Sequence, residues 1–231
     1  MERKKATYGS RMGAFIVDMF LIVILFFIFE FALCRNTIGN MKVVKDNLQT
    51  YNYYETEFAK VQDEYEIYIY DEENNRVYNE KLTEETKAAF EADERVIKIR
   101  EEIDPYAKKV IAYATIEYAI ALFLSSFIAL FVIPLIFKEG RTLGKLLLKV
   151  AVRNKDDSDI RWGKLLLRWI VQLVLEITLG LLTLLALPLI SLVCTTFTKD
   201  NKSLVDLICG TKVVQDLPVP RTNKNNIIEA E

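Results

Sequence analysis

Three long apolar runs, residues 12–33, 110–137 and 165–198, constrain this chain more than any other feature. A hydrocarbon core of about 30 Å requires roughly 20 apolar residues of helix. The first run meets that length and the second exceeds it, although Asp18 and Glu30 interrupt the first. Buried helices of a soluble protein are typically shorter and amphipathic. We therefore predict an all-α membrane protein with three to four transmembrane or re-entrant helices.

Composition argues against several kinds of site. The chain has no histidine, which removes the usual metal ligand and the usual general base. Its three cysteines, Cys34, Cys194 and Cys209, lie far apart and have neither metal-site nor disulfide-framework spacing. No nucleophile has a recognisable base partner. We therefore predict a protein that is not an enzyme, with no catalytic residues, no metal site and no cofactor.

Basic residues beside the apolar runs predict the topology, because Lys and Arg favour the cytoplasmic side. They are concentrated in residues 3–11 and 138–168. The N-terminus is thus expected in the cytoplasm of a multi-pass cell-membrane protein, and the composition rich in Lys, Ile and Asn hints at a bacterial source. Six parts follow: N-terminus and first transmembrane helix (1–35), acidic extracytoplasmic insert (36–109), second transmembrane helix (110–137), basic cytoplasmic loop (138–164), membrane hairpin or third transmembrane helix (165–198) and cytoplasmic tail (199–231).

The third run is too long for one crossing, because 34 residues of straight helix would span roughly 50 Å. Gly180 and Pro188 can break or kink it. We favour two short helices, 165–179 and 181–197, in a hairpin that returns the C-terminus to the cytoplasm. The alternative is a surface helix to Glu176 followed by one crossing. Residues 149–153 and 211–215 resemble strands; if they form a short cytoplasmic β pair, they must share one side of the membrane.

The insert is acidic, with 18 acidic and 11 basic residues in 36–109. We predict a small α+β fold: a helix over 40–66, a hairpin of strands 66–70 and 76–78, and a second helix. Thr83 is a good N-cap for that helix, which should end near Asp104 and Pro105. The insert is either a solvated spacer or a partner-binding domain.

Charged residues in or near the apolar runs are the candidate site. Arg11 and Asp18 are seven residues apart and therefore lie on one helix face, but their side chains lean toward the helix N-terminus, so each should pair with another element. Lys145 and Arg168 are candidate partners for Asp18, and Asp206 for Arg11. An intramembrane carboxylate is expensive, so Asp18 either fixes helix packing or forms an ion or proton site.

A second stripe of polar residues, Arg168, Gln172 and Glu176, follows helical spacing. It could line a polar cavity with Asp18 and Lys145, or lie solvated at the membrane surface. Residues 140–145 resemble a phosphate loop only superficially, because three residues separate the glycines and Leu146 follows the lysine. We expect no nucleotide and no nucleic acid as a ligand.

Three segments together resemble the RDD family of small membrane proteins, named for one arginine and two aspartates. Residues 10–18 resemble the family's first helix, with Arg11 and Asp18 in the named positions. Residues 140–145 resemble its element after the second helix, and residues 203–214 resemble its closing element, with Asp206 as the second aspartate. Within these elements we expect structural turn residues at the following positions: Gly140, Thr142, Gly144, Gly210 and Thr211.

The resemblance covers about residues 8–35 and 115–215, with two departures. Val205 stands where many members have histidine, and the insert is longer than in compact members. Members are mostly of unknown function; some look like ion antiporters and others like accessory or scaffold subunits. We expect a lipid-embedded protein that takes part in transport of an ion or small solute, with Asp18 as its intramembrane carboxylate and a homo-oligomer providing the path. The alternative is a scaffold or regulatory subunit whose insert binds a partner protein.

Overall fold

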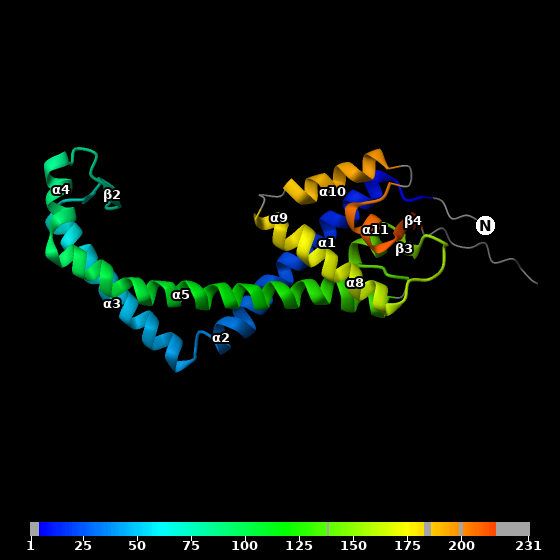
Figure 1. The fold of residues 1–231 in the computed structure, drawn as a ribbon, viewed down its shortest axis with the longest axis horizontal. Helices are drawn as coiled ribbons and strands as arrows, with labels where there is room; N and C mark the ends of the chain where they lie inside the picture. The colour runs from blue at the N-terminus through cyan, green and yellow to red at the C-terminus, as the bar shows by residue number, and fades with distance from the viewer. Residues whose placement is uncertain (1–4, 138, 183–185, 199–200, 216–231) are drawn as a thin grey trace, which may run out of the picture. The chain divides into compact units, whose positions relative to one another are not determined.

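The computed structural model describes residues 5–137, 139–182, 186–198 and 201–215. The chain divides into two compact units (Figure 1). Unit 1 comprises Met1–Phe27 with Leu122–Glu231, and unit 2 comprises Ile28–Ala121. The three RDD-like segments therefore fall mainly in unit 1, and the insert falls in unit 2.

Two continuous helices in the described part, Tyr8–Thr37 and Glu94–Ile136, are long and apolar enough to cross a membrane. The first consists of α1 (Tyr8–Phe29), the π-helical turn η1 (Glu30–Cys34) and α2 (Arg35–Thr37). The second consists of α5 (Glu94–Phe127), the π-helical turn η2 (Ile128–Val132) and α6 (Ile133–Ile136). Helices satisfy their own backbone hydrogen bonds, which an apolar surrounding demands.

The helix predicted to end at Asp104 and Pro105 does not end there. Helix α4 (Glu84–Ala92) ends at Asp93, whose backbone is extended, and α5 then runs through Pro105. Proline inside a helix costs about 3 kcal/mol but does not forbid the helix. Asp93 is the stronger signal, because its carboxylate accepts a hydrogen bond from the Arg95 amide at 2.7 Å and so caps the start of α5.

Unit 2 contains a helix, a hairpin and a capped second helix near the positions expected for the insert, while its location outside the cytoplasm stays a prediction. Helix α3 (Lys42–Glu64) leads to an antiparallel hairpin of β1 (Tyr68–Tyr70) and β2 (Arg76–Tyr78). Thr83 caps α4, because its hydroxyl accepts a hydrogen bond from the Thr86 amide at 3.2 Å. The unit has its own small core, formed by Val61, Ile67, Phe90 and Val96.

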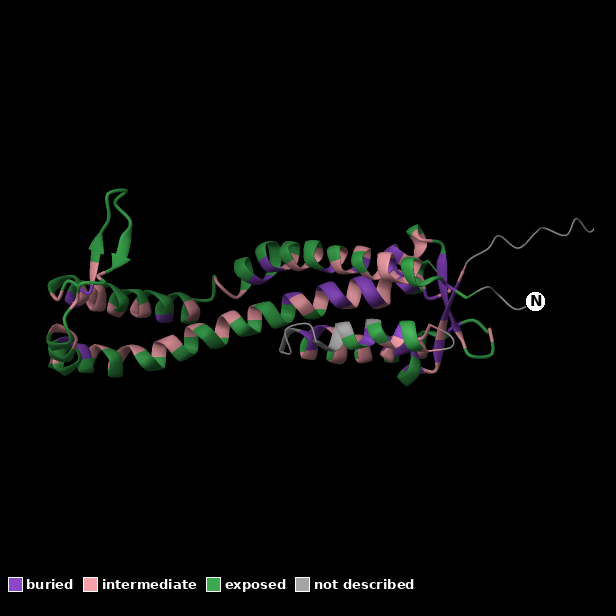
Figure 2. Ribbon diagram, turned by 90° about the horizontal axis from the view of Figure 1, so that it is seen from above, coloured by how far each residue is buried: buried purple, intermediate pink, exposed green. Residues whose placement is uncertain are grey.

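Unit 1 contains a second two-stranded sheet, which confirms the predicted β pair. Strand β3 (Val150–Asn154) pairs antiparallel with β4 (Thr211–Gln215). Lys5 forms an isolated bridge with Val214, so the N-terminal segment joins the sheet formed by β3 and β4. Figure 2 shows buried residues along these strands, and their core comprises Ala6, Ala14, Val150, Val152, Ile160, Leu165 and Val213.

The third apolar run forms two helical arms. The first arm is α8 (Trp162–Gln172), the π-helical turn η3 (Leu173–Thr178) and α9 (Leu179–Leu182); the second is α10 (Ala186–Phe197). The break predicted at Gly180 is wrong, because Gly180 lies within α9 and one glycine costs a helix only about 1 kcal/mol. Residues 183–185, between the arms, lie outside the described residues. Whether the run crosses a membrane once or returns stays a prediction.

Candidate functional site

Asp206 is held at the start of α11 (Leu204–Cys209) by a capping box. The Ser203 hydroxyl accepts a hydrogen bond from the Asp206 amide, and the Asp206 carboxylate accepts one from the Ser203 amide, both at 3.2 Å. Gly210 ends this short helix with a φ of 63°, a left-handed conformation that glycine adopts without strain. The carboxylate of Asp206 is thus fixed by local backbone geometry, and the residue is fully buried.

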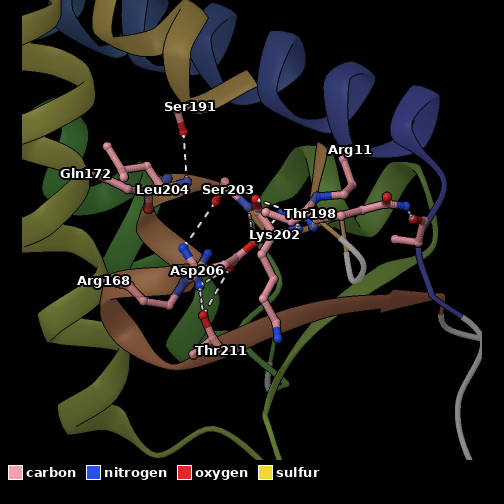
Figure 3. A network of polar contacts seen from close by, with 12 residues as sticks. Arg11, Arg168, Gln172, Ser191, Thr198, Lys202, Ser203, Leu204, Asp206 and Thr211 are labelled. Atoms are coloured by element: carbon pink, nitrogen blue, oxygen red, sulfur yellow. Dashed lines mark hydrogen bonds and ion pairs between the residues drawn. The ribbon is translucent and has the colours of Figure 1, made fainter. Parts of the chain in front are cut away.

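Two arginines and a threonine complete the surroundings of Asp206 (Figure 3). Arg11 from α1 pairs with Asp206 Oδ2, and Arg168 from α8 pairs with Asp206 Oδ1 at 2.6 Å. The Thr211 hydroxyl donates to the same Oδ1 at 3.1 Å and accepts a hydrogen bond from Arg168. These contacts join elements that lie up to 195 residues apart in the sequence.

The charge state of Asp206 follows from these partners. Burial by itself raises the pKa of a carboxyl, but the guanidinium groups of Arg168 and Arg11 outweigh burial and lower the pKa of Asp206 far below its usual value. Asp206 therefore remains an anion at all physiological pH values. We interpret this ion triad as a fixed clamp that holds α1, α8 and α11 together.

Asp18 has a different set of partners. Its Oδ2 accepts a hydrogen bond from the Thr142 hydroxyl at 2.5 Å, and its Oδ1 accepts one from the Gly144 amide at 2.8 Å. Lys145 Nζ lies 3.7 Å from Oδ2. These groups belong to the first turn of α7 (Leu143–Leu147), whose free amides favour a carboxylate. Asp18, only 4% exposed, thus binds the N-terminus of a short helix from another part of the chain.

Glycine at position 144 allows this close approach. A Cβ there would overlap the Ala14 carbonyl oxygen and lie 2.9 Å from Asp18 Oδ1. A Cβ on Gly13 would lie 2.6 Å from Leu148 Cδ1, so the contact is tight on both sides. Segment 140–145 therefore packs α7 against α1. In a phosphate loop the backbone amides bind an anionic ligand, whereas here the Gly144 amide already binds Asp18.

Lys145 is the basic side chain nearest to Asp18, and several other charged groups act on it. Burial lowers its pKa from the usual value, while the nearby Asp18 carboxylate opposes that shift. Charges on Arg168, Asp206 and Glu176 also act on it. With Arg11, the site gathers three basic side chains, Arg11, Lys145 and Arg168, and three acidic ones, Asp18, Glu176 and Asp206.

Glu176 is the third acidic side chain, and its direct partners in the described part of the chain are uncharged. Gln172 Nε2 donates to Glu176 Oε2 at 3.3 Å, and the Ser191 hydroxyl donates to Oε1 at 3.0 Å. The same hydroxyl accepts a hydrogen bond from the Leu204 amide at 3.3 Å, a contact drawn in Figure 3. Ser191 therefore connects Glu176 in the first arm to the start of α11, next to Asp206.

Most pairings suggested by the sequence are present. Arg11 lies against Asp206, and Lys145 lies near Asp18. Arg168 was also a candidate for Asp18, but it pairs with Asp206 instead, since Asp18 is already bound by the first turn of α7. The side chains of the polar stripe, which was expected to line a cavity, make direct hydrogen bonds instead. The surface hollows of about 410 and 390 Å³ beside Trp162 are lined by other residues.

Sequence reasoning missed four partners in this site. It gave Thr142, Gly144 and Thr211 only as turn residues, although all three bind the buried charges. It did not single out Ser191. A signal for Gly144 existed, because two glycines around a threonine after an apolar run suggest a close backbone approach. For Ser191 no comparable pattern exists.

Two helices long and apolar enough to cross a membrane, together with buried charged side chains beside a small sheet, are the features of a helical membrane protein. The RDD family model matches residues 5–210, so the chain belongs to the RDD family. That match spans both units, including the insert. No curated protein and no solved structure shows significant similarity to the chain.

Proposed function

We propose that this RDD-family protein takes part in transport of an ion or small solute, with Asp18 and Lys145 as the exchanging pair. The observation that carries the proposal is the position of Lys145: burial lowers its pKa, and its ammonium group lies 3.7 Å from the buried Asp18 carboxylate. Charged groups inside membrane proteins commonly mark ion and proton paths.

In the proposed exchange, the Asp18 carboxylate is compensated either by protonated Lys145 or by a bound cation. While Lys145 holds its proton, its ammonium group compensates Asp18. When that proton leaves, Asp18 retains only the Thr142 hydroxyl and the Gly144 amide, and its carboxylate no longer has an ammonium group beside it. A small cation beside Asp18 would restore neutrality. Asp206 does not take part, because two arginines hold it, and it keeps the surrounding helices in place.

The β pairing supports a particular membrane topology. Since the N-terminal segment, β3 and β4 share one sheet, they must share one side of the membrane. The basic residues of 138–164 favour the cytoplasm for that side. The run 165–198 then enters and returns as a hairpin, and unit 2 lies outside the cytoplasm. So few helices leave little room for a path, which is why we propose a homo-oligomer without cofactor or enzymatic activity.

Proton release on cation binding tests the exchanging pair directly. Sodium or potassium chloride is added to the detergent-solubilised protein in weak buffer, and a pH dye reports the released protons. We expect saturable release from the parent protein and none from Lys145→Met, while Lys155→Met, an exposed lysine of the same loop, behaves like the parent. Equal release from the parent and Lys145→Met would refute the pair.

A second candidate function is a scaffold or regulatory subunit. It is favoured by unit 2, which has its own core and an excess of acidic residues. Replacing residues 65–93 by a short Gly-Ser linker removes the hairpin and α4 while retaining α3 and α5. If a partner that co-purifies with the parent is lost and cation-coupled proton release persists, the insert is a docking unit. If no partner co-purifies with either protein, the scaffold is not supported.

A further inference from the structure

A surface hollow of about 410 Å³ at the start of α8 is not used by the buried charge network. It is lined by Asn154 from β3 and by residues 161–164. A Cβ placed on Gly163 would meet nothing within 4 Å, so no described atom fills the space beside this glycine. Two of the described lining residues, Arg161 and Lys164, are basic, and none of them is acidic. The hollow is therefore a small cationic surface that a ligand can reach from outside.

The positive charges at this hollow have no carboxylate bound to them among the described residues. Arg161 is exposed, makes no side-chain hydrogen bond or ion pair there, and does not cap α8. The Lys164 ammonium donates to the neutral amide oxygen of Asn154 at 2.8 Å. The three aspartates of residues 156–159 each have another partner, in chain order a serine hydroxyl, Lys212 and a buried arginine. An anionic ligand would thus meet two cations without displacing a carboxylate.

Apolar residues beside the hollow indicate the depth at which it lies. Trp162 is 68% exposed; it lines this hollow and also, together with Leu135 of α6, the second hollow at the end of the second long apolar helix. Tryptophan is enriched where membrane-spanning helices meet the headgroup region. Three exposed apolar residues follow Gly163 on one helix face along α8 and η3: Leu167, Ile170 and Val174. A cationic hollow with an apolar stripe leading away from it matches the two parts of a phospholipid.

We propose that this hollow binds the headgroup of an anionic phospholipid such as phosphatidylglycerol, with an acyl chain along the apolar stripe. The guanidinium of Arg161 suits phosphate oxygens, because its fork of donors matches their geometry, and Lys164 adds a second positive charge. Basic pockets at the cytoplasmic ends of membrane helices commonly bind anionic headgroups. A zwitterionic lipid fits less well, since its own ammonium group is repelled by both basic side chains.

Native mass spectrometry of the detergent-solubilised full-length protein tests the site, with phosphatidylglycerol and phosphatidylcholine as probes. We expect the parent to bind phosphatidylglycerol more tightly than phosphatidylcholine. A basic side chain near an anionic lipid surface contributes roughly fivefold to affinity, so Arg161→Gln and Lys164→Gln should each weaken phosphatidylglycerol binding by about that factor. Lys155→Gln, an exposed lysine of the same loop that does not line the hollow, should bind like the parent.

Tryptophan fluorescence gives a second readout on the parent protein itself. Of the two tryptophans in the chain, Trp162 is exposed and Trp169 is buried. In phosphatidylcholine vesicles, brominated phosphatidylglycerol should therefore quench the fluorescence at a lower mole fraction than brominated phosphatidylcholine does. The difference should disappear in Arg161→Gln, whose replaced side chain makes no described contact that folding would need.

Three results would overturn the proposal. The first is equal affinity of the parent for the two lipids, and the second is a loss of binding in Lys155→Gln as large as that in Arg161→Gln. The third is displacement of bound phosphatidylglycerol by inorganic phosphate at constant ionic strength, which would indicate a site for a free anion instead of a lipid. Each measurement is made without an ion gradient, so its outcome is independent of whether the protein transports anything.

Discussion

Asp18 and Glu30 lie in the same apolar run, twelve residues apart, and both are buried, yet their surroundings differ completely. Asp18 is bound by a hydroxyl, an amide and a nearby ammonium group. Glu30 has none of these among the described residues. Burial alone therefore does not define the role of a carboxylate in such a helix. The partners do: the first joins a network of charged side chains, and the second lacks a counter-charge within the described chain.

Removing the charge of Asp206 should have the largest effect on unit 1. In Asp206→Asn, Arg11 and Arg168 would be buried without a counter-charge, and breaking a buried ion pair from one side costs about 3–5 kcal/mol. We expect a large drop in the thermal unfolding temperature in detergent. Glu101→Gln should unfold like the parent. A stability of Asp206→Asn equal to that of the parent would mean that the triad is not a clamp.

The contact between α7 and α1 can be broken without changing any charge. Gly144→Ala introduces a methyl group against the Ala14 carbonyl and Asp18, and such overpacking typically costs about 1–3 kcal/mol. We expect lower thermal stability together with loss of proton release on cation binding. The matched control is Gly163→Ala, where a Cβ meets nothing within 4 Å. Equal behaviour of the two variants would exclude a tight contact at position 144.

The independence of the two units can be tested at the cap of α4. Thr83→Ala removes the side-chain acceptor for the Thr86 amide, a loss of about 1 kcal/mol. Hydrogen exchange followed by mass spectrometry should show faster exchange in residues 84–92 and no change in β3 or β4. Faster exchange in the sheet of unit 1 would show that the units are energetically coupled.

The smallest effect concerns the pH dependence of stability. Because burial lowers the pKa of Lys145 in the folded protein, the unfolded chain binds more protons between that lowered value and 10.5. The stability contributed by this group is therefore complete above 10.5 and falls as pH decreases through the lowered pKa. Relative to Lys145→Met, the parent should gain thermal stability as pH rises from 7 toward 10. An unchanged difference would mean that the pKa of Lys145 is not shifted.

Much of the architecture could be predicted from the sequence, because membrane helices and capped helices have strong local signals. The two apolar helices, the hairpin 68–78 and the Thr83 cap follow from length, alternation and cap chemistry. The pairing of β3 with β4 was also predictable from two strand-like segments. The helix through Pro105 was not, because the cost of one proline is local and was outweighed by the rest of α5.

The charge network was only partly predictable, because spacing shows which residues share a helix face and not which elements meet. The Arg11–Asp206 contact could be suggested from charge complementarity. The choice of Arg168 for Asp206 depends on where α11 begins, which only the fold determines. The lack of a described partner for Glu30 could not be inferred from the sequence either, since an absent contact leaves no pattern.

Sodium- and potassium-dependent proton flux in proteoliposomes tests the central claim most directly. The parent is compared with Asp18→Asn and with Glu101→Gln, after membrane insertion and orientation of each protein have been verified. The account predicts flux from the parent and Glu101→Gln and none from Asp18→Asn. Flux that persists in Asp18→Asn, or no flux from any of the three proteins, would contradict cation–proton exchange at Asp18.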